Sequence, residues 1–271
     1  MIIDFTLNAY KSLLQNLQKS AYVFFTFEEY CTKKSECKTE QKLVILRHDV
    51  DLKPENSLQT AKIENQLGIK ATYYFRVIPD SNNPDIIKSI AALGHEIGYH
   101  YEDMSLYNGD AEKAIKHFEK QIEYFRQFYP VKTICMHGAP QSKYDGKDLW
   151  KKYDYHDFGI IGEPYFDSDF SDFFYITDTG RMWDGYNVSV RDKIPVHQDR
   201  WISQGLVYHY TKDICKAIDL GTFPKRMMIT THPQRWTNNT IEWMRELLLQ
   251  NVKNVIKFLI KRMKKSISSL H

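Results

Sequence analysis

The chain has 271 residues, of which 42% are hydrophobic and 14% aromatic, which suits one globular domain with a sizeable core. Its net charge of +3 is weak and gives no support to nucleic-acid binding. No stretch approaches the ~18 apolar residues of a membrane span, and the N-terminus lacks a basic segment followed by an apolar run, so we expect a cytoplasmic, soluble protein. The scattered cysteines contain no CxxC pair, which is typical of a reduced chain: Cys31, Cys37, Cys135 and Cys215.

The first half of the chain alternates helix and strand patterns at short spacing. The expected elements are a helix over 6–19, a strand over 21–27, a loop or short helix over 31–41, a strand over 43–48, a helix from Pro54 to Gly68, a strand over 70–77, a helix over 83–94, a strand over 95–102, a helix over 109–130 and a strand over 132–138. This alternation favours a parallel sheet or a (β/α) barrel.

The second half is less regular. Residues 141–200 are rich in Asp, Tyr and Gly, with short strands expected over 158–165 and 173–177. A late strand over 226–233 and a long helix over 240–265 close the chain. We find no repeat and no linker, and expect a single domain over 1–271, with an N-terminal extension (1–41) and the C-terminal helix.

Titratable side chains follow four of the expected strands. The strand ends read Arg47-His48-Asp49-Val50-Asp51, Gly98-Tyr99-His100-Tyr101-Glu102, Met136-His137-Gly138 and Thr231-His232-Pro233. In parallel β/α proteins these ends converge on one face, where active sites gather.

Strand alternation sorts these side chains by face. In 95–102 a period of two puts Glu96, Gly98, His100 and Glu102 on one side, and the same rule puts Asp49 and Asp51 together. Asp51 and His100 are then natural ligands for a divalent metal such as zinc. The alternative for Asp51 is a helix cap, because it lies just before Lys53-Pro54-Glu55-Asn56.

The ordered combination "RHDVD…LGIKATYYF…LGHEIGYH" resembles the polysaccharide deacetylase superfamily, which is carbohydrate esterase family four with the NodB-homology fold. The match is close over 43–102, with looser echoes at "MHGAP" and "THP". The resemblance implies an α/β fold, a distorted (β/α) barrel of about seven parallel strands.

The resemblance also implies roles for single residues. Asp49 resembles the catalytic base, Asp51 the metal-binding acid, His100 the first histidine ligand and His232 the general acid. The implied reaction is removal of an acetyl group, N- or O-linked, from a sugar or polysaccharide precursor, with a divalent metal, most simply Zn²⁺. His48 is expected to orient a neighbouring acid rather than to bind metal.

Two positions depart from the family pattern. The second histidine ligand normally lies four residues after the first, where this chain has Met104. Glu102 is the expected substitute, with Asp103, His137 and Glu96 as alternatives. The arginine that lines the family's groove is absent from its usual place near "MHGAP", and Arg181 or Arg235 is expected to replace it.

Two further segments bear on ligands. Trp183 and Trp236 lie in polar, aromatic surroundings and are candidate platforms for stacking a sugar ring, although either could equally be a core residue. The helix over 240–265 is expected to pack its apolar face on the barrel and leave a basic rim in solvent. A less favoured alternative is weak contact of this helix with an anionic membrane surface.

Two classes of function, an enzyme and a binding protein, remain open at this point, and a hydrolase of a different amide or ester, with the same metal and a changed pocket, is a further possibility within the first. The first is a metal-dependent carbohydrate deacetylase of cell-envelope glycans. The second is an inactive deacetylase-like barrel that binds a glycan or partner protein, having lost a metal ligand at Met104. The oligomeric state cannot be read from the sequence.

Overall fold

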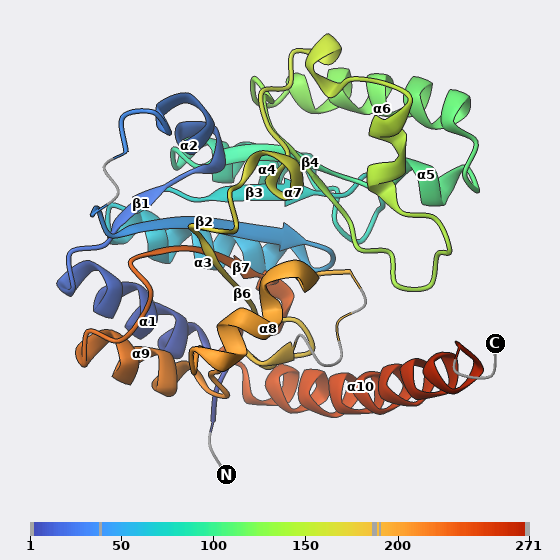
Figure 1. Cartoon of the computed structure of the whole chain (residues 1–271). Coiled ribbons are helices and arrows are strands. Elements are labelled where there is room, and N and C mark those ends of the chain that lie inside the picture. The colour runs from blue at the N-terminus through green and yellow to red at the C-terminus, as the bar shows by residue number, and fades with distance from the viewer. Residues whose placement is uncertain (1–2, 38–39, 186–188, 190, 269–271) are drawn as a thin grey trace.

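The computed structural model describes residues 3–37, 40–185, 189 and 191–268, with side chains up to residue 256. Within this part of the chain a seven-stranded parallel sheet has the order β5-β4-β3-β2-β7-β6, and β1 pairs with the start of β2 (Figure 1). The strands are β1 (Val23–Phe25), β2 (Leu43–Val50), β3 (Thr72–Phe75), β4 (Glu96–Tyr101), β5 (Ile134–Met136), β6 (Phe174–Thr177) and β7 (Arg226–Thr231). The predicted α/β fold with seven parallel strands is therefore confirmed.

The sheet is curled and open, so it forms a half-barrel. Its two end strands, β5 and β6, make no ladder with each other in the described residues. Near this opening a single bridge joins Thr133 to Gly162. The expected strand over 158–165 is thus reduced to one bridge, because Pro164 and the Glu163 cap start a short helix, α7 (Pro164–Asp167).

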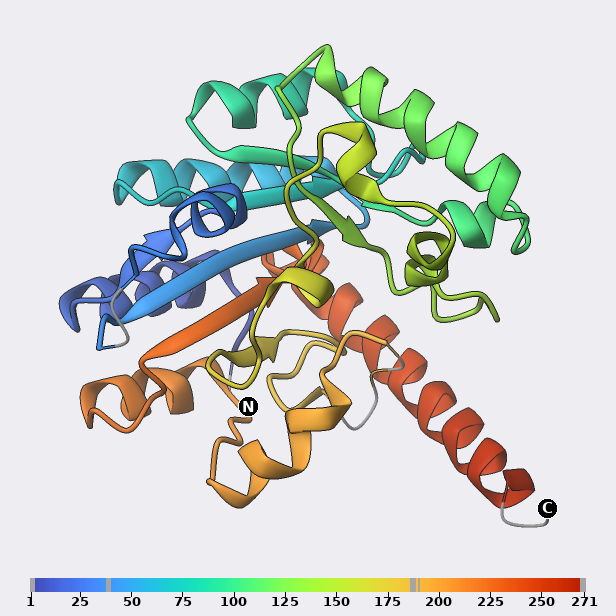
Figure 2. The same cartoon turned by 45° about the horizontal axis from the view of Figure 1, so that its top comes forward.

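The helices that connect the strands along the chain pack against the sheet (Figures 1 and 2). They are α1 (Leu7–Lys19), α2 (Phe27–Lys33), α3 (Pro54–Gln66), α4 (Pro84–Ala92), α5 (Asp103–Leu106), α6 (Ala111–Arg126), α8 (Pro195–Ser203), α9 (Thr211–Asp219) and α10 (Thr240–Ser268), with 3₁₀ turns η1 (Gly146–Lys151), η2 (Tyr155–Phe158) and η4 (Pro233–Arg235). The expected helices agree with α1, α3, α4, α6 and α10, whereas α5, α8 and α9 were not expected.

Strand β2 lies at the centre of the sheet and is buried along its whole length. Its apolar half, Leu43–Leu46, is fully buried, as expected for a strand covered on both faces. One edge pairs with β7, while the other pairs first with β1 and then with β3. The polar half, Arg47–Val50, is thereby held at the carboxyl edge of the sheet beside β3 and β7.

The packing of α10 is the reverse of the expected one. Trp243, Gln250 and Asn254 face the body, while Met244, Leu248, Val252 and Val255 are exposed. The prediction that the apolar face packs on the barrel is wrong, because the contacts with the body come from the other face: the Trp243 carbonyl accepts a hydrogen bond from Arg181, and Asn254 donates to the Gly180 carbonyl. No helix in the described part of the chain is both long and apolar enough to cross a bilayer.

Candidate metal centre and active site

A polar pocket of about 90 Å³ lies at the carboxyl edge of the sheet. Its walls come from the ends of β2, β4, β5 and β7 and from the loop that precedes α8. The lining residues include Asp49, Asp51, His100, His137, His232 and Arg235. The structure therefore brings together side chains from all four polar strand ends that the sequence pointed to.

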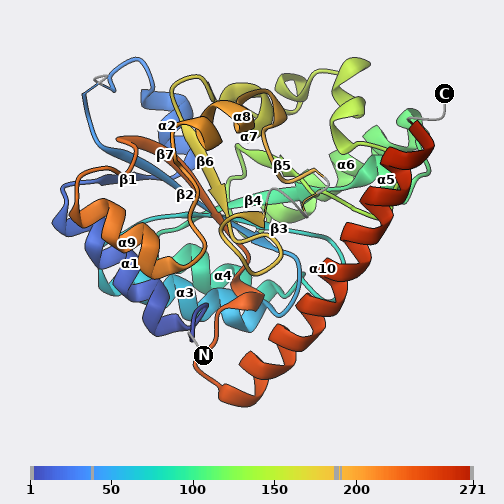
Figure 3. The same ribbon diagram turned by 60° about the horizontal axis from the view of Figure 1, so that its bottom comes forward.

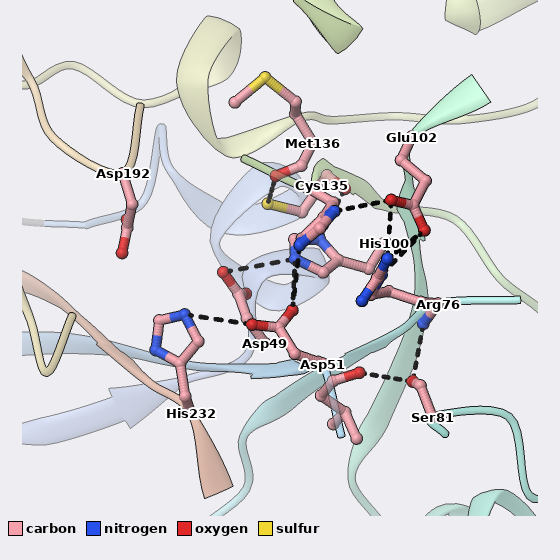
Figure 4. Close-up of polar contacts among 12 residues, drawn as sticks. Asp49, Asp51, Arg76, Ser81, His100, Glu102, Cys135, Met136, Asp192 and His232 are labelled. Atoms are coloured by element: carbon pink, nitrogen blue, oxygen red, sulfur yellow. Dashed lines mark hydrogen bonds and ion pairs between the residues drawn. The ribbon is translucent and has the colours of Figure 1, made fainter. Parts of the chain in front are cut away.

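Three imidazole rings surround the Asp51 carboxylate (Figure 4). Oδ1 of Asp51 lies 3.6 Å from Nε2 of His100 and 3.6 Å from Nε2 of His137, and Oδ2 lies 3.8 Å from Nε2 of His232. These distances are too long for direct hydrogen bonds. Oδ1 is inaccessible to solvent and has no hydrogen-bond partner among the described residues. A buried carboxylate oxygen without a partner is costly unless a cation meets it.

The two histidines nearest Oδ1 present their lone pairs to it. Nδ1 of His100 donates to the Cys135 carbonyl at 2.9 Å, and Nδ1 of His137 donates to Glu102 at 2.8 Å. In the neutral form of each ring, a proton on Nδ1 leaves Nε2 as the nitrogen with the lone pair, which is how metal-bound histidines are usually oriented. Burial lowers the pKa of His100 to about 4, so this ring is neutral near pH 7.

Asp49 is paired with a buried arginine, Arg47, for which the sequence predicted no role. Nε and Nη2 of Arg47 donate to the two oxygens of Asp49 at 2.8 and 2.7 Å. Burial alone would raise the pKa of Asp49, but Arg47 and the nearby His100 outweigh it and hold the pKa well below its usual range. The Asp49 carboxylate is therefore fixed in place and ionised at neutral pH.

His232 is held by Asp178, a second residue that was not expected. Asp178 accepts hydrogen bonds from Nδ1 of His232 (2.6 Å), from Nη1 of Arg235 (2.6 Å) and from Nε1 of Trp236 (2.7 Å). Burial and Arg235 would lower the pKa of His232, but Asp178 more than compensates and the net shift is upward. A histidine with a raised pKa and its Nε2 facing the pocket can donate a proton there.

Glu102, the expected third metal ligand, has other partners. Nε and Nη2 of Arg76 donate to its two oxygens, both at 2.8 Å, and His137 donates to it as well. Both oxygens of the Glu102 carboxylate therefore already accept hydrogen bonds, and Glu102 affects the pocket by orienting the His137 ring. Met104, where the family has a histidine, is buried in the hydrophobic core.

His48 points away from the pocket. Because it lies between Arg47 and Asp49 on a strand, its side chain is on the opposite face of the sheet. Nε2 contacts Glu64 at 2.7 Å and Nδ1 contacts Thr231 at 2.6 Å. His48 therefore ties β2 to α3 and β7 and does not orient an acid of the pocket.

Glu96 lies at the opposite end of β4 from His100. Its buried carboxylate accepts hydrogen bonds from the backbone of Glu28 at 2.9 Å and from the hydroxyls of Thr72 and Thr133. It thus caps α2 and is remote from the pocket. Burial raises its pKa from 4.5 to about 7.

Replacing Glu96 by glutamine is expected to flatten the pH dependence of stability. Because the pKa of Glu96 is higher in the folded state, its favourable contribution is complete below pH ~4.5 and is lost as pH rises to ~7, a change of about 3 kcal/mol. Urea denaturation at several pH values measures this. Glu112→Gln, on the surface of α6, is the control. An unchanged pH slope in Glu96→Gln would contradict the assignment.

The two tryptophans expected to stack on a sugar are core residues. Trp183 is 4% exposed and donates to Thr211, and Trp236 is fully buried. Neither offers a ring face to a ligand. Arg181, one expected replacement for the groove arginine, is also buried and donates to the Trp243 carbonyl under α10. The other, Arg235, does line the pocket.

Two pocket residues come from the stretch that the sequence left unassigned. Nη1 of Arg191 donates to the carbonyls of Gly138 and Ala139, both at 2.8 Å, and so holds the "MHGAP" segment in place. Asp192 accepts a hydrogen bond from Thr177 at 2.9 Å and lines the pocket opposite His100 (Figure 4). No local pattern marks either residue, because their partners are far away in the sequence.

A second group of possible ligand atoms overlaps the first. One atom each from Asp49, His100 and Cys135 lie within 4.8 Å of one another, so this buried group could hold a metal ion. Two features weaken it as a ligand set. Both oxygens of Asp49 are taken by Arg47, and burial raises the pKa of the Cys135 thiol well above its usual value.

Solved structures of carbohydrate esterases and deacetylases are similar to this chain at low identity. A deacetylase of Streptococcus pyogenes, solved with acetate, has 15% identity and a TM-score of 0.41, with 48% of this chain and 60% of that chain covered. The Xyl-CE4 domain of a multidomain xylanase from the hindgut metagenome of Trinervitermes trinervoides has 15% identity and a TM-score of 0.42, with 79% and 84% covered.

A family 4 carbohydrate esterase from Bacillus anthracis has 11% identity and a TM-score of 0.42, with 90% of this chain and 86% of that chain covered. No family model matches the sequence, and no curated protein matches it.

Proposed function

We propose that this protein is a metal-dependent hydrolase that removes an acetyl group, N- or O-linked, from a sugar or polysaccharide precursor. The observation that carries the proposal is the Asp51 Oδ1 atom, buried without a hydrogen-bond partner among the described residues and equidistant from His100 and His137. The motif order in the sequence supports the same class of reaction.

Asp51, His100 and His137 are the ligands in this proposal. Two of the three separations among these atoms, the 3.6 Å between Oδ1 and each Nε2, are close to the about 3.3 Å that bonds of 2.0–2.1 Å would give in a tetrahedral zinc site. His137 then fills the role for which Glu102 was first expected. A divalent cation bound there supplies a Lewis acid for the acyl carbonyl and for water.

The other side chains of the pocket have separate tasks. Asp49, held ionised by Arg47, orients the attacking water and accepts its proton. His232, with its pKa raised by Asp178, protonates the departing amine or alcohol. Hydrolysis of an acyl group also forms an oxyanion, which backbone N–H groups can stabilise. The N–H of His137 is not free for this, because it donates to the Tyr101 carbonyl at 2.8 Å.

Metal content tests this proposal first. Protein purified without chelator is expected to carry about one zinc per chain, and restoring zinc after chelation is expected to raise the melting temperature, because a ligand bound only to the folded state stabilises it. Asp51→Ala is expected to abolish both effects. Failure to bind zinc or another divalent metal would favour the inactive glycan-binding barrel instead.

A further inference from the structure

Helix α10 attaches to the body through a narrow polar stripe. Nδ2 of Asn254 donates to the Gly180 carbonyl at 2.8 Å, and Nε2 of Gln250 donates to Asn254 at 2.8 Å. Near the start of the helix, the guanidinium of Arg181 lies 4.5 Å from the Trp243 ring. Trp243, Gln250 and Asn254 are spaced by seven and four residues and so share one face of the helix.

The opposite face of α10 is apolar and open to solvent. Between residues 241 and 256 the exposed fractions run from 48% at Leu249 to 80% at Ile241. The exposed set is Ile241, Met244, Leu248, Leu249, Val252, Val255 and Ile256. We call these seven residues the α10 apolar face. A continuous apolar stripe of this kind on the surface of a protein marks an interaction site.

The helix projects from the body, which leaves this face accessible (Figures 2 and 3). Figure 1 also shows that α10 runs toward the same side as the arrowhead of β2, which is the side of the pocket. The helix begins five residues after η4, the turn that follows His232. A surface that binds α10 therefore lies on the side of the molecule where the pocket opens.

The charge of α10 is opposite in sign to that of the rest of the chain. Its sequence has seven Lys and Arg residues and two acidic ones, a net charge of +5. Since the whole chain has +3, the remaining residues sum to −2. Basic residues combined with an apolar face are typical of helices that lie in the headgroup region of an anionic membrane.

We propose that α10 docks on the surface of an anionic lipid membrane, with the α10 apolar face inserted among the headgroups. A second copy of the chain is the alternative occupant. It is disfavoured because pairing two such helices would bring two charges of +5 together. An anionic lipid surface complements the same charge. This inference does not depend on the chemistry of the pocket.

Vesicle flotation of the full chain tests the proposal. We expect binding to phosphatidylcholine vesicles with about 30 mol% phosphatidylglycerol and none to phosphatidylcholine alone. Raising the salt from about 0.05 to about 0.5 M should weaken binding at least about tenfold, because salt screens the headgroup charge. Equal binding to both kinds of vesicle, or to neither, would overturn the proposal.

Matched variants separate the apolar and basic contributions. The double change Leu248→Glu with Val252→Glu is expected to abolish binding, and Lys253→Gln to weaken it about fivefold. Val196→Glu, at an 87% exposed position on α8, is the control and should bind normally. Circular dichroism checks the fold.

Two results would contradict membrane docking. Undiminished vesicle binding by the Leu248→Glu, Val252→Glu variant would exclude the α10 apolar face as the contact. A dimer in light scattering that this variant dissociates, without vesicle binding by the wild type, would assign the face to a second copy.

Discussion

His137→Ala is expected to lower zinc affinity more than about 100-fold and to reduce deacetylation in parallel, since even outer partners of metal ligands contribute 10–100-fold. The reason is that Nε2 of His137 lies 3.6 Å from the buried Oδ1 of Asp51, with its proton fixed on the other nitrogen by Glu102. Zinc competition titration at constant pH measures the affinity.

Glu102→Gln distinguishes the two candidates for the third ligand. If His137 is the ligand, the glutamine side chain at position 102 has the shape of the glutamate but holds the His137 ring less firmly. Zinc binding should then weaken only about 10–100-fold. Met104→Leu is the control and should bind zinc normally, because Met104 packs in the core. Zinc retained in His137→Ala but lost in Glu102→Gln would make Glu102 the ligand.

Asp49→Asn is expected to keep the metal and to reduce kcat/KM by about 10²–10⁴, the usual contribution of a general base. An amide cannot accept the proton that the ionised carboxylate takes. The change also leaves the fully buried Arg47 without its counter-ion, which should destabilise the fold by about 3–5 kcal/mol. Turnover is measured on an acetylated sugar that the wild type hydrolyses.

A companion variant separates the loss of chemistry from the loss of stability. Arg47→Met combined with Asp49→Asn removes the buried charge as well as its partner, so the melting temperature should recover while turnover stays low. If Asp49→Asn alone hydrolysed the substrate at the wild-type rate with its metal in place, Asp49 would not be the base.

The sheet and most of the pocket were predictable because they depend on local patterns. Strands β2, β4, β5 and β7 are each followed directly by a carboxylate or histidine side chain, and parallel strands present those ends at one edge. The same rule would have found Asp178, which follows directly after β6. It was missed because the end of the strand expected over 173–177 was not compared with the four polar strand ends.

Contacts between residues distant in the sequence were not predictable. The side-chain period placed Glu96 and Glu102 on the same face of the strand. It could not show that Glu96 accepts a hydrogen bond from the backbone of α2, or that Glu102 is paired with Arg76. The pattern of α10 identified its apolar face correctly. Only the folded chain shows that the body binds the other face, through Trp243 and Asn254.

Strand β2 is anchored to its neighbours by His48, which contacts Glu64 of α3 and Thr231 of β7. A slip of one position along β3 or β7 would turn His48 to the other face of the sheet and break both of these contacts. The strand therefore cannot slide to adjust to an incoming ion. A metal ion bound at Asp51, as proposed above, would meet a backbone whose ordering entropy was already lost during folding. Selectivity among cations would then depend on the size and geometry of a site that is already formed before the ion binds.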